Sequence, residues 1–120
     1  MKRESRVLVV DSVDGIVLCI LFRGSLGIEH VMAFRDCTDL AYRLSRRRGV
    51  WGEVSYIAFL SDACVNTVRE LGYRLIDYRS LPLQVIEQVK VIRSVVARSM
   101  DVLRMIGVLS ADEDDDKPTR

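Results

Sequence analysis

Three apolar segments follow one another near the start of the chain, separated by turns that are too short for anything but hairpins. The segments are residues 6–10, 16–22 and 28–34. Asp14 and Gly15 form a favourable hairpin turn because glycine readily adopts positive φ, and the glycine-containing residues 24–27 supply the second turn. Two short turns in succession predict an antiparallel three-stranded meander.

From residue 38 the spacing of apolar residues changes, and helical segments alternate with strand-like ones. The predicted helices span residues 38–48, 63–71 and 83–109, and the predicted strands span residues 54–60 and 74–78. Helical crossovers would add these strands parallel to the first one. The expected fold class is therefore α/β, with a mixed five-stranded sheet in the order β-β-β-α-β-α-β-α and a long C-terminal helix.

Length and composition narrow the class of protein further. A chain of 120 residues suits one domain, which we expect to span residues 1–109. A hydrophobic content of 49% excludes a disordered chain. No stretch approaches the ~18 apolar residues of a membrane span, and the apolar run 7–10 is too short for a signal peptide. We therefore expect a soluble, cytoplasmic protein with no membrane partner.

The formal net charge of +1 hides an uneven distribution. Residues 110–120 hold five acidic and two basic side chains, and we expect this acidic tail to be disordered. Since the tail carries a net −3, the rest of the chain carries a net +4. A mildly basic body is compatible with nucleic-acid contact without requiring it.

The three cysteines are Cys19, Cys37 and Cys64. Their number is odd, their spacing is wide, and no C-x-x-C motif occurs, so a zinc site or a disulfide framework is not predicted. We expect buried or half-buried free thiols in a reducing compartment.

The last predicted helix has apolar residues at spacings of four and three, which is typical of a long amphipathic helix. Its main stripe comprises Val85, Val89, Ile92, Val96 and Leu103. A second apolar edge comprises Val91, Val95 and Val102. A helix of ~25 residues is nearly 40 Å long, which is more than a domain of this size needs. We therefore expect a homodimer that forms through residues 85–106.

Three carboxylates fall where predicted elements end or begin. Asp11 ends the first strand, Asp36 follows the third, and Asp62 follows the fourth. The element order matches the ribonuclease H-like fold, in which the first and fourth strands are neighbours. Carboxylates gathered at that sheet edge would hold one or two Mg²⁺ ions, which prefer oxygen ligands and activate water for phosphodiester hydrolysis. Each acid also has a structural explanation as a turn residue or helix cap.

The stretch Ala33-Phe34-Arg35-Asp36 resembles the S-F-R-E motif of endonuclease V, which closes its third strand with a metal-binding carboxylate. Residues 58–62 take the place of that family's L-L-V-D-G motif. A related archaeal family of unknown function has V-D-G-T-D-A-T and G-F-N-V-V-D motifs, which resemble residues 35–41 and 72–77. The resemblance implies that Asp11, Asp36 and Asp62 are catalytic metal ligands.

The chain departs from endonuclease V at several positions. Residues 27–32 lack the aromatic wedge that opens the duplex, and Ala63 replaces the glycine that follows the fourth-strand acid. The late catalytic acid has no clear equivalent, with Asp77 and Glu87 as candidates. These departures put recognition of a deaminated base in doubt.

Basic side chains offer a second functional signal. Arg46, Arg47 and Arg48 end the first predicted helix, with Arg43 one turn earlier and Arg35 just before the helix. They are positioned to neutralise a nucleic-acid backbone, or to interact with the C-terminal helix dipole.

Two hypotheses remain open. The first is a Mg²⁺-dependent nuclease of DNA or RNA, in which Asp11, Asp36 and Asp62 hold the metal and the arginines position the backbone. The second is a non-catalytic binding or assembly module on the same fold, which dimerises through its C-terminal helix.

Overall fold

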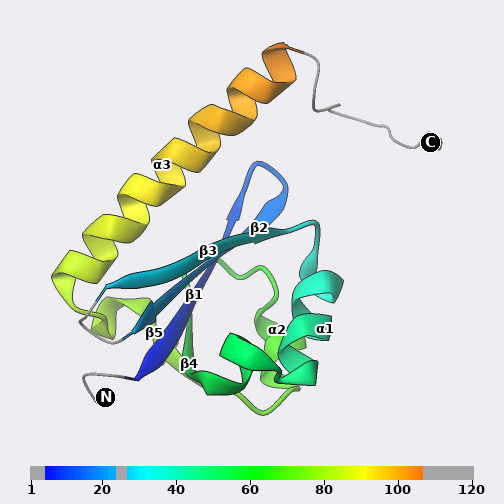
Figure 1. Ribbon diagram of the computed structural model, residues 1–120, viewed down its shortest axis with the longest axis vertical. Coiled ribbons are helices and arrows are strands. Elements are labelled where there is room, and N and C mark those ends of the chain that lie inside the picture. Colours follow the sequence, from blue (N-terminus) through cyan, green and yellow to red (C-terminus); the bar gives the residue numbers. More distant parts are fainter. Residues whose placement is uncertain (1–4, 24–26, 107–120) are drawn as a thin grey trace.

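The computed structural model describes residues 5–23 and 27–106 (Figure 1). The strands are β1 (Arg6–Val13), β2 (Ile16–Arg23), β3 (Ile28–Phe34), β4 (Val54–Phe59) and β5 (Arg74–Asp77). The helices are α1 (Cys37–Arg46), α2 (Val65–Arg69) and α3 (Leu83–Met105), with short 3-10 turns η1 (Gly49–Glu53) and η2 (Tyr78–Ser80). The predicted acidic tail 110–120, the turn residues 24–26 and a helical continuation to residue 109 lie outside the described residues.

The five strands form one mixed sheet in the spatial order β3-β2-β1-β4-β5. β1 pairs antiparallel with β2, and β2 pairs antiparallel with β3, which confirms the predicted meander. β4 pairs parallel with β1, and β5 pairs parallel with β4. The α/β class, the mixed five-stranded sheet and the long C-terminal helix are thus confirmed.

The hairpin between β1 and β2 is tighter than expected, and it moves Asp11 into a strand. Asp14 and Gly15 have φ values of 49° and 86°, as a two-residue type I′ turn requires. β1 therefore continues to Val13, which pairs with Ile16, and Asp11 pairs with Leu18. The expectation that Asp11 ends the first strand is wrong, because strand pairing persists up to the turn.

The two faces of the sheet carry separate hydrophobic layers, since side chains alternate along each strand. Leu8 and Val10 of β1 pack on one face with Leu40 and Leu44 of α1 and with Val68 of α2. On the other face α3 covers the sheet, and the buried residues there include Val7, Val9, Leu18, Ile20, Phe22, Val85 and Val89. Figure 1 shows α3 crossing one face while α1 and α2 lie against the other.

Helix α3 begins directly after Pro82, as predicted, but its main apolar stripe is not a free surface. Val85 and Val89 are each only 2% exposed because they pack on the sheet of their own chain. They are therefore unavailable for the predicted dimer contact. The second edge is the exposed one: Val91, Val95 and Val102 are 63%, 56% and 54% exposed.

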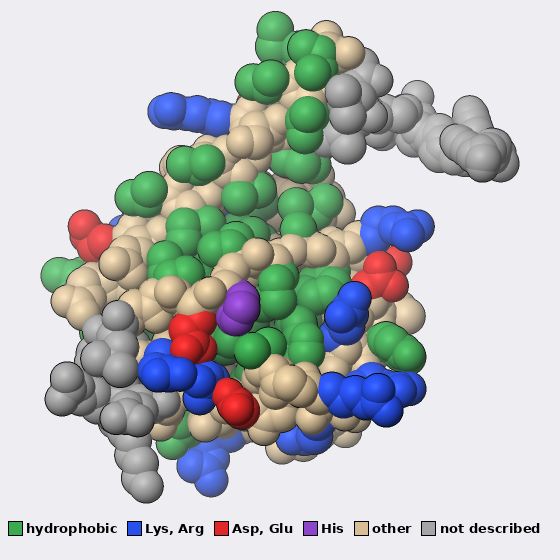
Figure 2. Space-filling model, viewed as in Figure 1, with side chains coloured by type: hydrophobic (Ala, Val, Ile, Leu, Met, Phe, Trp, Pro, Cys, Tyr) green, Lys and Arg blue, Asp and Glu red, His purple; other side chains and the backbone are tan. Residues whose placement is uncertain are grey.

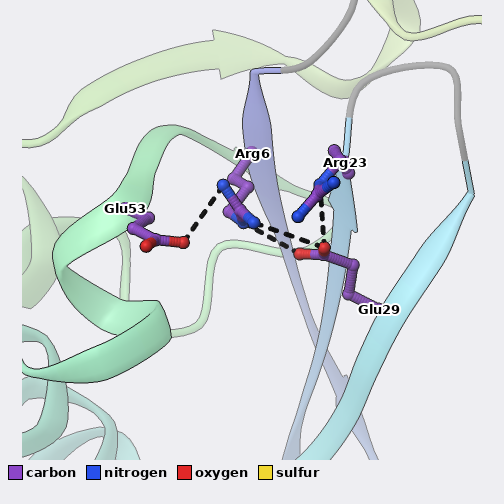
Figure 3. Close-up of polar contacts among 4 residues, drawn as sticks. All are labelled: Arg6, Arg23, Glu29 and Glu53. Atoms are coloured by element: carbon purple, nitrogen blue, oxygen red, sulfur yellow. Dashed lines mark hydrogen bonds and ion pairs between the residues drawn. The ribbon is translucent and has the colours of Figure 1, made fainter.

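An ion-pair network joins the start of β1 to the edge strand β3 and to η1 (Figure 3). Glu29 pairs with Arg6 and with Arg23 at 2.9 Å each, and Arg6 also pairs with Glu53 at 3.0 Å. β3 bonds directly to β2, so the contact between Arg6 and Glu29 adds a link from β3 to β1. This network lies at the start of β1, and we assign it a structural role.

Candidate functional site

Asp11 is the one buried charged side chain among the described residues, at 4% exposure. Its two carboxylate oxygens have separate partners within the chain. Oδ1 accepts a hydrogen bond from the backbone N–H of Ser12 at 2.8 Å, and Oδ2 accepts one from Nε of Arg93 at 2.6 Å. Arg93 belongs to α3, so this ion pair fastens that helix to the central strand of the sheet.

Asp36 and Asp62 lie next to the first turns of the two shorter helices. Asp36 is the N-cap of α1, and its Oδ1 accepts a hydrogen bond from the backbone N–H of Asp39 at 3.0 Å. This placement agrees with the structural explanation of the residue as a helix cap. Asp62 is exposed, and its backbone carbonyl accepts from the N–H of Val65, the first residue of α2, at 3.3 Å.

The structure does not assemble the three predicted carboxylates into one group. Across residues 5–23 and 27–106, no set of three or more His, Cys, Asp and Glu side chains is arranged to hold a metal ion. The reason lies in the alternation along β1. Asp11 shares a face with Val9 and Val13, which pack in the layer covered by α3, whereas Asp36 caps a helix on the opposite face. Magnesium binding remains a prediction.

A disulfide joins the starts of the two shorter helices, which corrects the expectation of three free thiols. Cys37 is the first residue of α1 and Cys64 is the N-cap of α2, and their Cα atoms are 5.2 Å apart. Only Cys19 is a free thiol, and its burial raises its pKa to about 12, which keeps it protonated and unreactive. Wide sequence spacing did not reveal the pair because two helix starts at one sheet edge bring distant residues together.

All five predicted nucleic-acid-binding arginines are exposed, and two of them also lie over an aromatic ring. Arg47 adopts a left-handed conformation at the C-cap of α1, lies 4.1 Å above the ring of Tyr73, and donates from Nη2 to the carbonyl of Leu71 at 3.0 Å. Arg46 lies 5.5 Å from the ring of Tyr42. Arg35, Arg43 and Arg48 are exposed. Arg47 therefore contributes to the fold, and contact of all five arginines with nucleic acid remains a prediction.

Tyr73 shows how Arg47 serves the fold. The Tyr73 hydroxyl donates to the carbonyl of Leu44 at 2.8 Å, which joins the residue just before β5 to α1 inside the protein. Burial raises the pKa of this phenol, and the neighbouring Arg47 charge partly offsets the rise. The Tyr73 hydroxyl therefore stays protonated and can donate its hydrogen bond to the carbonyl of Leu44.

Comparison with known proteins adds no assignment. No protein-family profile matches the sequence, and no curated protein shows significant similarity to it. Within the described residues, no helix has the length and apolar character needed to cross a bilayer.

Arg93 is the residue of this site that sequence reasoning missed. It lies 82 positions from Asp11, and nothing in the local pattern marks it as a partner. Only its position on α3 indicates that it faces the sheet. Arg93 follows Val85 and Val89 by eight and four residues, and so it lies near their face of the helix.

Proposed function

We propose that this protein is a non-catalytic assembly module on a ribonuclease H-like sheet, which dimerises through the distal half of α3. The strand order β3-β2-β1-β4-β5, antiparallel across the first three strands and parallel across the last two, supports that fold assignment. Both halves of the function rest on α3. Its Arg93 pairs with Asp11, and its outer edge exposes Val91, Val95 and Val102.

The ion pair between Asp11 and Arg93 is the observation that carries the non-catalytic assignment. A divalent cation at Asp11 would have to displace a guanidinium that already neutralises the carboxylate at 2.6 Å. Asp36 is engaged as a helix cap on the opposite face, and Asp11, Asp36 and Asp62 do not form a metal-binding group in the part of the chain that the structure describes. Hydrolysis assisted by a metal ion requires ligands that hold the ion and leave a coordination position open for water or substrate.

The length and outer edge of α3 support self-association. Its 23 residues correspond to about 35 Å, whereas the eight residues of β1 extend about 26 Å. Figure 1 shows the distal half of α3 projecting beyond the sheet, and Figure 2 shows hydrophobic side chains along that projection. We call Val91, Val95 and Val102 the outer stripe. Their spacing of four and seven keeps them on one side of the helix, as in helix pairing.

The outer stripe provides the first test. Wild-type protein is expected to sediment as a dimer at micromolar concentration, and the V95E/V102E variant as a monomer with an unchanged circular dichroism spectrum. The reason is that two buried carboxylates without partners oppose the contact. Ser94→Glu is the matched control, because residue 94 lies off the stripe and is exposed. Sedimentation velocity of the wild type as a monomer at every concentration would refute dimerisation.

Nuclease activity provides the second test, and it decides between the two hypotheses. We expect wild-type protein with Mg²⁺ or Mn²⁺ to leave plasmid DNA, single-stranded DNA and RNA uncut, as the Asp11→Asn variant does. Gel electrophoresis with a fluorescent substrate measures both. Metal-dependent cleavage by the wild type that Asp11→Asn abolishes would replace this proposal by the nuclease.

A further inference from the structure

A cavity lies between the sheet and the first half of α3, beside Asp11. Its apolar lining includes Leu60, which directly follows β4, together with Leu81 and Val89. Its volume is about 240 Å³. Since a water molecule occupies about 30 Å³ in the liquid, the cavity has room for a molecule of roughly eight non-hydrogen atoms. The ends of parallel strands are where open α/β sheets commonly bind ligands.

The cavity carries an excess of positive charge. One side of α3 lines the cavity with Ile86, Val89, Lys90 and Arg93, as their spacing of three, one and three allows. Lys90 and Arg93 oppose a single acid, Asp11. Among the described residues, Arg93 has no other acidic partner and uses only Nε for that pair, and Lys90 has no ion pair. Both cationic side chains are exposed, which places their charged groups at the mouth.

We propose that this cavity binds a small organic carboxylate, with an apolar body of about five carbons against Leu60, Leu81 and Val89. The carboxylate would lie at the mouth, between the ammonium of Lys90 and the remaining donors of Arg93. Apolar walls favour burial of the hydrocarbon. A guanidinium and an ammonium favour a carboxylate over an uncharged or cationic group. The site goes beyond the assembly function, because it lies on the sheet side of α3 and excludes the outer stripe.

Hexanoate is the probe, since its eight non-hydrogen atoms match the volume. In methyl NMR spectra of the full chain, hexanoate is expected to shift the signals of Leu60, Leu81 and Val89 saturably. Leu44 and Val68 report on the opposite face of the sheet and are expected to stay in place. Hexylamine, with the same chain and the opposite charge, is expected to cause no saturable shift, and 1-hexanol to bind at least roughly tenfold more weakly than hexanoate.

Two variants link the binding to the cavity. Lys90→Gln is expected to weaken hexanoate binding roughly tenfold through loss of one charged contact. Arg69→Gln is the control, because Arg69 is exposed on α2 and lies neither in the cavity nor in the outer stripe. Ile86→Phe fills the cavity and is expected to abolish the shifts, while unchanged Leu44 and Val68 signals show that the protein is still folded.

Three results would overturn the proposal. The first is equal affinity for hexylamine and hexanoate, which would remove the role of charge. The second is an equal loss of affinity in the Lys90 and Arg69 variants. The third is a hexanoate response in the folded Ile86→Phe variant that equals the wild-type response.

Discussion

Replacing Cys37 and Cys64 with alanine is expected to lower the free energy of unfolding by about 3.5 kcal/mol and the melting temperature by roughly 15 °C. The disulfide closes a loop with a sequence separation of 27, and the unfolded chain gains conformational entropy when that loop opens. Thermal and urea unfolding followed by circular dichroism measure both quantities.

Reductant and thiol counting make the disulfide prediction specific. A reducing agent is expected to lower the stability of the wild type to that of the C37A/C64A variant and to leave the variant unchanged. In denaturant without reductant, one thiol per chain is expected to react, because Cys19 is the free cysteine. Three reactive thiols before reduction, together with a melting temperature that ignores reductant, would show that the bond does not form.

Removing the guanidinium from Arg93 is expected to cost about 2 kcal/mol of stability. Arg93→Met leaves Asp11 buried without its charged partner, which is the costly way to break an ion pair. The figure is smaller than for a fully enclosed pair because the Arg93 side chain is 53% exposed and water reaches it. Urea unfolding of the variant and the wild type measures the difference.

A double replacement separates the ion pair from the packing of α3. In D11L/R93M an apolar pair replaces the charged one, and the stability is expected to return to within about 1 kcal/mol of the wild type. Arg69→Met, at an exposed position of α2 away from both the ion pair and the outer stripe, is expected to change stability by less than about 0.5 kcal/mol. A double variant as unstable as Arg93→Met alone would show that Arg93 acts through its packing and not through its charge.

Local signals in the sequence predict the elements of this fold well. The hairpin residues Asp14 and Gly15 mark the first turn, and Pro82 marks the start of α3. Asp36 was recognised as a possible cap and is one. Each of these signals acts over a few residues, so neighbouring positions are enough to reveal it.

The side-chain partners in the site depend on which face of the sheet a residue occupies. Asp11 was placed at a strand end, but two further residues of pairing enclose it in the layer beneath α3. A change of a few residues in the end of β1 therefore makes Asp11 a buried carboxylate and not the surface carboxylate that the sequence predicts. The pairing with Arg93 follows from how α3 packs, which hydrophobic spacing alone does not determine.

The disulfide was within reach of the same reasoning that grouped the acids. Cys37 follows Asp36 by one residue, and Cys64 follows Asp62 by two. An argument that brings the ends of β3 and β4 to one edge of the sheet brings these cysteines together as well. The wide spacing along the chain conceals this shared edge, which is why the sequence alone indicates free thiols.

The helices on the two faces of the sheet differ in how easily they can detach from it. A disulfide joins α1 to α2 on one face, whereas α3 is held on the other face by apolar packing and by the ion pair between Asp11 and Arg93. Partial opening therefore begins with detachment of α3, and it exposes the apolar side chains of Leu18, Ile20 and Phe22. An exposed apolar sheet face associates with other exposed apolar surfaces. We therefore expect aggregation to start from a state in which α3 has detached and the strands are still paired.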